Sequence, residues 1–165
     1  MFKRMLSTRS LCISAIIAAL YAALTLLLAP ISYGNLQCRV SEALTLLPVL
    51  LPEAVPGLTV GCLLANLIGS STPWDVIFGT LATLIAALLT RKTRKVLWTG
   101  LQLPIVSAFW PILSNGLIVG AVLSLTLGLP LLLTMAEVAI GETAALLIGL
   151  AVYPALKRLR LPDYD

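Results

Sequence analysis

Several polar side chains stand inside long apolar runs of this chain, and they are the residues that could do chemistry. The ionisable and amide side chains of this kind are Gln37, Arg39, Glu42, Asn66, Asp75, Asn115, Glu137 and Glu142. A charge at the centre of a bilayer costs about 2.5–3.5 kcal/mol on insertion scales, and such residues usually serve a function. Their importance therefore depends on whether the surrounding runs lie in a membrane.

The composition indicates an integral membrane protein. The chain has 165 residues, of which 59% are hydrophobic and 11% are charged, whereas an average soluble domain carries about 25% charged residues. A soluble protein this short would expose too much apolar surface. We therefore expect one all-α, membrane-embedded domain over residues 1–165. No basic face is available for nucleic acid, so no nucleic-acid partner is expected.

The apolar runs predict a six-transmembrane-helix bundle. The expected helices cover about residues 11–29, 40–51, 55–69, 74–90, 96–125 and 130–156. The second and third are short, because twelve residues reach only roughly 18 Å and the hydrocarbon core is about 30 Å thick. Pro48, Pro52 and Pro56 also interrupt this region. We expect the preceding linker to fold down over the bundle; the alternative is a half-depth hairpin with four true spans.

The basic residues predict the orientation of the chain. They form clusters at Lys3–Arg9, Arg91–Lys95 and Lys157–Arg160. Short basic clusters beside apolar runs favour the cytoplasmic side. We therefore predict a multi-pass protein of the cell membrane with both termini in the cytoplasm. The linkers near residues 31–39, 70–73 and 126–129 then face outside.

With this topology, most of the polar side chains fall in the outer half of the bundle. We predict a ligand pocket there, and hydrogen bonding between helices is the alternative. Trp110 lies deep in the fifth run, where it could stack on a planar ligand or pack in the core. Glu137 and Glu142 are five residues apart, about 140° around a helix, so both cannot point straight into one pocket. Glu53 and Gln102 fall toward the cytoplasm and are left out.

Several classes of function lack the residues that they need. The chain has no histidine, and Cys12, Cys38 and Cys62 do not form a CxxC pair, so no metal site is expected. No Ser-His or Cys-His nucleophile is possible, and no Gly-rich phosphate loop is present. We therefore expect neither an enzyme nor a bound cofactor.

Small residues recur at four-residue spacing on three expected helices. Ala15, Ala19 and Ala23 lie on the first, Gly57 and Gly61 on the third, and further glycines on the fifth. Such stripes let helix backbones approach closely. They indicate either internal packing or a docking face for another membrane protein.

Two stretches resemble the signature of a known family. Residues 29–44, APISYGNLQCRVSEAL, and residues 73–84, PWDVIFGTLATL, look like motifs of the QueT family. Asn115 with Gly120, and Gly141 with Glu142, are similar to its weaker later motifs. The likeness covers roughly residues 11–158. The chain departs from the family pattern at Asn35 and Cys38, where proline and phenylalanine are usual. These differences affect the expected loop shape and ligand preference more than the assignment to the family.

The resemblance implies a function. QueT proteins are substrate-capture (S) components of energy-coupling factor (ECF) transporters, and they take up queuosine precursors. S components have six helices, bind their ligand under extracellular loops, mainly the one between helices 1 and 2, and dock on two ATPases and a transmembrane coupling (T) protein. Docking would use Ala15, Ala19 and Ala23. For a deazaguanine base, Glu42 or Glu142 would accept its N–H donors, and Gln37, Arg39 or Asn115 would donate to its carbonyl. The other predicted ligand-binding residues are Asn66, Asp75, Trp110 and Glu137.

Two other functions are compatible with the same residues. One is a self-sufficient proton-coupled transporter in which Glu137 or Glu142 carries the proton. The other is a membrane scaffold without transport, in which the polar layer only joins helices.

Overall fold

The computed structural model describes residues 7–32, 38–69, 72–98 and 102–158. In these ranges the secondary structure is helical, apart from an isolated bridge between Trp98 and Leu103. The expected all-α fold is confirmed. The elements are α2 (Thr8–Leu27), α3 (Ala29–Ser32), the 3-10 helix η1 (Val40–Leu46), α4 (Leu47–Leu50), α5 (Ala54–Gly69), α6 (Pro73–Lys92), α7 (Ile105–Leu127) and α8 (Leu131–Arg158).

Local sequence signals explain where the long helices begin and end. The Ser7 side chain caps α2 by accepting a hydrogen bond from the Ser10 backbone N–H at 3.2 Å. Thr72 caps α6 in the same way, with Pro73 in the first turn. Gly128 ends α7 with φ 69°, a left-handed conformation that glycine adopts without strain.

Four helices in the described ranges, α2, α6, α7 and α8, are long and apolar enough to cross a membrane. The two expected short helices are also present in altered form. The second is a 3-10 helix continued by one turn of α-helix, and the third is α5, whose 16 residues reach about 24 Å at 1.5 Å per residue. The structure thus supplies four full-length spans and two shorter apolar elements, and six crossings stay a prediction.

The expected start of the fifth helix, near Val96, was wrong. α7 begins at Ile105, directly after Pro104. Proline has no backbone N–H, so Pro104 fits the N-cap position just before the first turn, although α7 and α8 also contain Pro111 and Pro154 in their interiors. Gln102, with φ 53°, also lies outside helical geometry. The connection from α6 to α7 is therefore a loop at the basic end of the molecule.

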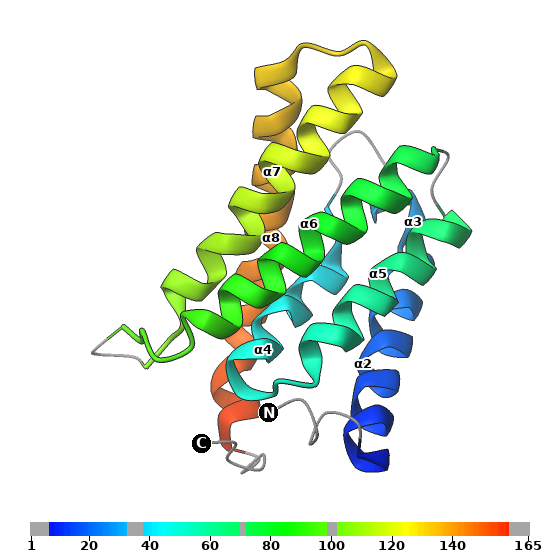
Figure 1. The fold of residues 1–165 in the computed structure, drawn as a ribbon. Coiled ribbons are helices and arrows are strands. Elements are labelled where there is room, and N and C mark those ends of the chain that lie inside the picture. The colour runs from blue at the N-terminus through cyan, green and yellow to red at the C-terminus, as the bar shows by residue number, and fades with distance from the viewer. Residues whose placement is uncertain (1–6, 33–37, 70–71, 99–101, 159–165) are drawn as a thin grey trace.

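The five longest helices surround η1. In Figure 1, α2, α5 and α6 lie side by side, and the α7–α8 hairpin extends beyond them at one end. Neighbouring contacts run from α2 to α5, α5 to α6, α6 to α7 and α7 to α8. The 3-10 helix contacts all five of them. Its side chains are therefore enclosed by apolar helices on several sides.

Glycines set the closest approaches between these elements. A Cβ placed on Gly61 would lie 2.8 Å from the Ala18 carbonyl oxygen, and one on Gly57 would lie 2.8 Å from the Ser14 carbonyl oxygen. On the far side of η1, a Cβ on Gly149 would lie 2.6 Å from the Ala43 carbonyl oxygen. The Gly57–Gly61 stripe thus joins α5 to α2, which is internal packing.

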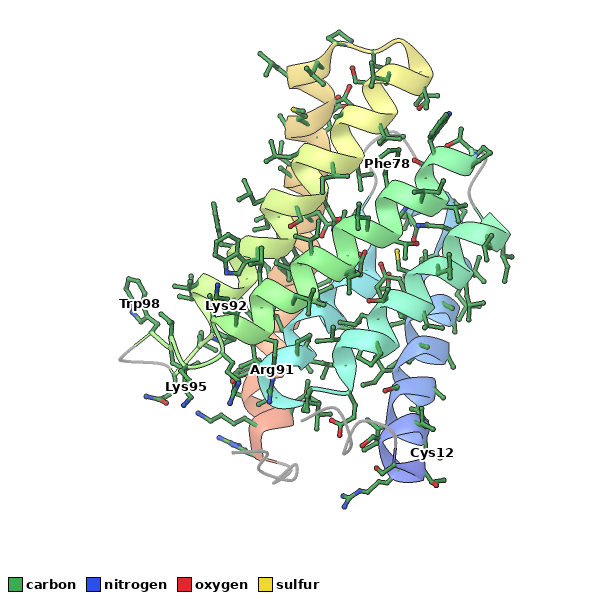
Figure 2. All side chains as sticks on the ribbon, viewed as in Figure 1. Cys12, Phe78, Arg91, Lys92, Lys95 and Trp98 are labelled. Carbon is green, nitrogen blue, oxygen red and sulfur yellow. The ribbon has the colours of Figure 1, made fainter. Side chains whose placement is uncertain are left out.

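The described residues of the basic clusters lie at one end of the bundle, as expected for residues on one side of a membrane. Figure 2 shows Arg91, Lys92 and Lys95 at the end of the molecule where α2 begins. The Lys157 ammonium of α8 contacts Gln102 Oε1 at 3.5 Å in the α6–α7 loop. The assignment of this end to the cytoplasm stays a prediction.

Arg91, in the last turn of α6, binds the short helix α4 at this end of the bundle. Arg91 Nη1 donates hydrogen bonds to the carbonyl oxygens of Pro48 at 3.0 Å and Val49 at 3.3 Å. Nearby, the Ser10 hydroxyl donates to Glu53 Oε1 at 3.1 Å. Glu53 is buried at this end, consistent with its expected place away from the polar layer.

We predict that Gly61→Ala lowers the stability of the bundle. The added methyl group would press on the α2 backbone, and overpacking of this kind costs about 1–3 kcal/mol, which outweighs the gain of about 0.5–1 kcal/mol from replacing a helical glycine. The measurement is the midpoint of thermal unfolding in detergent. Val60→Ala, on the exposed face of the same helix, is the control and should change it little. An unchanged midpoint for Gly61→Ala would contradict the packing.

Candidate functional site

The candidate site is built around a buried carboxylate on η1. Glu42 is 0% exposed, and its Oε1 accepts a hydrogen bond from the Tyr21 hydroxyl of α2. One turn further along α2, the Thr25 hydroxyl lies 2.7 Å from the Ser41 hydroxyl of η1. The Glu42 backbone carbonyl accepts a hydrogen bond from the Thr45 hydroxyl at 2.6 Å. These contacts fix η1 against α2 through polar groups.

α5 and α6 contribute a second group of buried polar side chains. The Thr83 hydroxyl lies 3.3 Å from the Cys62 sulfur, and Asn66 Nδ2 lies 3.4 Å from the same atom. Asn66 Nδ2 also donates to the backbone carbonyl of Asp75 at 3.2 Å, where α6 begins. Cys62 and Asn66 are one helical turn apart, so α5 presents both to α6.

α7 and α8 contribute a second carboxylate. Asn115 Nδ2 donates to Glu142 Oε1 at 2.9 Å, and both side chains are buried. The two residues come from the middle of long apolar helices. Thr83 and Asn115 also face the Glu42 carboxylate, which joins this pair to the group on η1.

Arg39, just before η1, is the cation of the site. If a Cβ were added at Gly79, it would lie 4.0 Å from Arg39 Nη1 and 2.9 Å from Asn66 Nδ2. A side chain at Gly79 would therefore crowd both groups. The charge of Arg39 acts on both Glu42 and Glu142. We call the following residues the buried polar cluster: Tyr21, Arg39, Glu42, Cys62, Asn66, Thr83, Asn115 and Glu142.

Three oxygens of this cluster have open hydrogen-bonding capacity. Within the part of the chain that the structure describes, Glu42 Oε2, Glu142 Oε2 and Asn66 Oδ1 are buried without a hydrogen-bond partner. Leaving a buried acceptor unsatisfied costs about 1–3 kcal/mol, more for a charged group. The cluster is therefore suited to a ligand that supplies N–H or O–H donors.

The structure brings most of the expected binding residues together. Arg39, Glu42, Asn66, Asn115 and Glu142 belong to the cluster. Asp75 is buried in the first turn of α6, and its carbonyl oxygen binds Asn66. Gln37 lies outside the described residues.

Two expected binding residues are not brought into the cluster. Trp110 is half-buried, with its ring edge-on to Phe109. Glu137 is half-buried on α8. Trp110 is five residues from Asn115 and Glu137 is five residues from Glu142, and five residues turn an α-helix by about 140°. Among the described residues, neither side chain forms a hydrogen bond or ring contact with the cluster, and Trp110 Nε1 is buried without a partner.

The sequence alone did not identify Tyr21, Cys62 and Thr83 as parts of the site. A hydroxyl in the middle of an apolar run was the available signal for Tyr21. Cys62 was expected to be a small buried apolar residue; it is buried, but its sulfur also accepts hydrogen bonds. Thr83 gave no signal, because threonine in a helix often bonds its own backbone.

The described residues contain no group of three or more histidine, cysteine, aspartate or glutamate side chains that could hold a metal ion. All three cysteines are free thiols. The chemistry that remains is hydrogen bonding and charge pairing by carboxylate, guanidinium, amide and hydroxyl groups. These groups can bind a polar solute by hydrogen bonds and ion pairs.

The fold and the cluster together define a membrane protein with a polar site enclosed by apolar helices. The chain belongs to the QueT transporter family, whose model matches residues 11–158. It is 36% identical over 157 residues to the queuosine precursor transporter QueT of Lactococcus lactis subsp. cremoris (strain MG1363), a match that covers 89% of this chain and 92% of that protein. No solved structure matches. The family resemblance seen in the sequence is confirmed.

We predict that Tyr21→Phe destabilises the protein by about 1–3 kcal/mol, because it leaves the buried Glu42 carboxylate without its hydroxyl donor. The measurement is again the unfolding midpoint in detergent. Tyr153→Phe is the matched control, since Tyr153 is also buried but its hydroxyl makes no described hydrogen bond. Equal midpoints for the two variants would contradict the role of Tyr21.

Proposed function

We propose that this chain captures a queuosine precursor, a deazaguanine base, as the S component of an ECF-type importer. Its family membership and the name of its Lactococcus relative support a queuosine precursor as the ligand. The observation that carries the proposal is the pair of buried carboxylates, each with an open oxygen, inside a ring of apolar helices. Mass spectrometry of whatever co-purifies with the detergent-extracted protein tests it directly.

The cluster matches the polar edges of such a base. The guanine-like edge carries N–H donors, which the open oxygens of Glu42, Glu142 or Asn66 would accept. The carbonyl of the base needs a donor, which Arg39 or Asn115 would supply. A base without these groups would leave the buried atoms unpaired, and this penalty gives selectivity.

The cluster would be reached from the side opposite the basic end. If that end is cytoplasmic, the linker between α2 and η1 faces outside, and Arg39 directly follows this linker. Asn66 lies three residues from the outer end of α5. The predicted cover over the ligand falls on residues 33–37 of this linker, which lie outside the described residues.

The energy for transport would come from a partner. No ATP-binding motif is present in the sequence, which fits a subunit that docks on two ATPases and a T protein. Ala15, Ala19 and Ala23 are exposed on α2 and would form the docking face. Ala19 and Ala23 are each two residues from Tyr21, about 160° around the helix. α2 would thus carry the docking face on one side and a cluster residue on the other.

We predict that Glu42→Gln, Asn115→Ala and Glu142→Gln each weaken binding of a deazaguanine base at least tenfold, because each removes a charge or hydrogen-bonding group next to the ligand. Isothermal titration of the purified protein measures this. Unchanged affinity in all three variants would show that the cluster is not the binding site. Absence of any small-molecule binding would favour a scaffold.

Ala19→Leu should abolish uptake into cells while leaving ligand affinity unchanged, because a bulky side chain would prevent close helix docking. Ala144→Leu, at an exposed alanine on α8, is the control and should transport normally. Survival of uptake in Ala19→Leu would place the docking face elsewhere. Uptake by vesicles that lack any ATPase, driven by a pH gradient, would instead support a proton-coupled transporter.

A further inference from the structure

We propose that a groove between α4 and α8 binds an anionic phospholipid, with one acyl chain in the groove and the headgroup on Lys157 and Arg158. This inference concerns a second site, because no residue of the buried polar cluster lines the groove. It does not depend on which solute the cluster binds. The lipid would bind from the surrounding membrane, independently of that solute.

The groove lies where η1 and α4 pack against the C-terminal half of α8 (Figure 1). It is a cavity of about 110 Å³, and we call it the α8 groove. Its lining includes Leu44, Leu47 and Leu50 on one side and Val152, Tyr153 and Leu156 on the other. Gly149, which brings α8 onto the Ala43 carbonyl oxygen, marks the end farther from the basic residues.

The apolar lining determines what can occupy the α8 groove. An apolar cavity does not hold water, and an engineered one of about 150 Å³ stays dry and binds benzene. The groove is open on one side, because Val152 is 48% exposed and Leu44, Leu47 and Leu50 are only partly buried. Since α8 is long and apolar enough to cross a membrane, this open side faces lipid. An acyl chain has the polarity and the length to lie in it.

Positive side chains lie at the other end of the α8 groove. Leu156 is its last lining residue on α8, and Lys157 and Arg158 follow directly, both exposed. Among the described residues no carboxylate forms an ion pair with either of them, and Lys157 contacts the neutral amide of Gln102. Basic pockets between transmembrane helices near the membrane surface bind anionic lipid headgroups. A phosphate group would therefore be stabilised at this end.

α6 adds positive charge on the α4 side of the α8 groove. Arg91 binds the carbonyl oxygens of Pro48 and Val49 in α4, and its charge and that of Arg94 act on each other. Arg94 therefore lies near the same end of α4. The headgroup would meet positive charge from both sides of the groove, which favours an anionic headgroup over a zwitterionic one. A neutral protein side chain could fill the groove but would make no use of these charges.

The test measures how much lipid the purified full-length protein retains. Native mass spectrometry of the protein in detergent would count bound dioleoyl phosphatidylglycerol and dioleoyl phosphatidylcholine, which share acyl chains and differ in headgroup charge, after both are offered in equal amounts. We expect at least tenfold more phosphatidylglycerol. Lys157→Gln and Arg158→Gln should each reduce this preference. Lys92→Gln removes an exposed charge from α6, which does not line the groove, and should leave it unchanged.

A second variant tests the groove itself. Val152→Trp should fill the α8 groove and lower the retention of both lipids. Ile148→Trp is the matched control, because Ile148 is 47% exposed on the same helix but does not line the groove. It should retain both lipids as the unmodified protein does.

Three results would overturn the proposal. They are equal retention of the two lipids by the unmodified protein, unchanged retention in Val152→Trp, and loss of uptake in Val152→Trp with retention unchanged, which would assign the groove to a partner protein. If Val152→Trp fails to fold, as judged by its unfolding midpoint, the preference measured on the unmodified protein and the glutamine variants still decides the proposal.

Discussion

A carboxylate held at the centre of an apolar bundle is the constraint on which this structure depends. Glu42 sits on a 3-10 helix, whose backbone hydrogen bonds are less regular than those of an α-helix. Such backbone is tolerated at membrane depth only when protein surrounds it. The ring of α2, α5, α6, α7 and α8 provides that enclosure, and the Tyr21 hydroxyl provides a donor for the carboxylate.

The enclosure is tightest where glycines replace side chains. Gly57 and Gly61 bring α5 onto α2, and Gly149 brings α8 onto Ala43 of η1. Between these close contacts, α2 meets η1 through hydroxyl and carboxylate groups, Thr25 with Ser41 among them. Tight apolar packing thus lies on both sides of the polar contacts between α2 and η1, and these contacts include Tyr21 and Glu42 of the cluster.

The sequence predicted the features that follow from solvation and charge. Apolar runs indicated the helices, and the basic clusters at Arg91 and Lys157 indicated a shared end. The cost of burying Glu42, Asn115 and Glu142 in lipid marked them as functional. Each of these inferences depends on the free energy of moving apolar or charged groups between water and lipid, which is larger than the differences in local helix propensity.

Other features depend on geometry that the sequence does not display. Trp110 and Glu137 had suitable chemistry, but among the described residues they form no hydrogen bond or ring contact with the cluster. Tyr21 and Thr83 join the site through contacts between distant segments. The start of α7 was missed because apolar residues before Pro104 resemble a helix, although the proline limits where that helix can begin.

Arg91 has a consequence for how orientation and folding are linked in this protein. It belongs to the basic cluster that favours the cytoplasm, yet it is buried on the carbonyl groups of Pro48 and Val49. Lys92 and Lys95 beside it are exposed (Figure 2), so their charges can be exchanged or moved with little structural effect. Arg91 is not interchangeable with them, because its guanidinium also holds α4 against the last turn of α6. Positive charge at this end can therefore move among the exposed lysines, whereas a change at Arg91 would also remove two hydrogen bonds that hold α4.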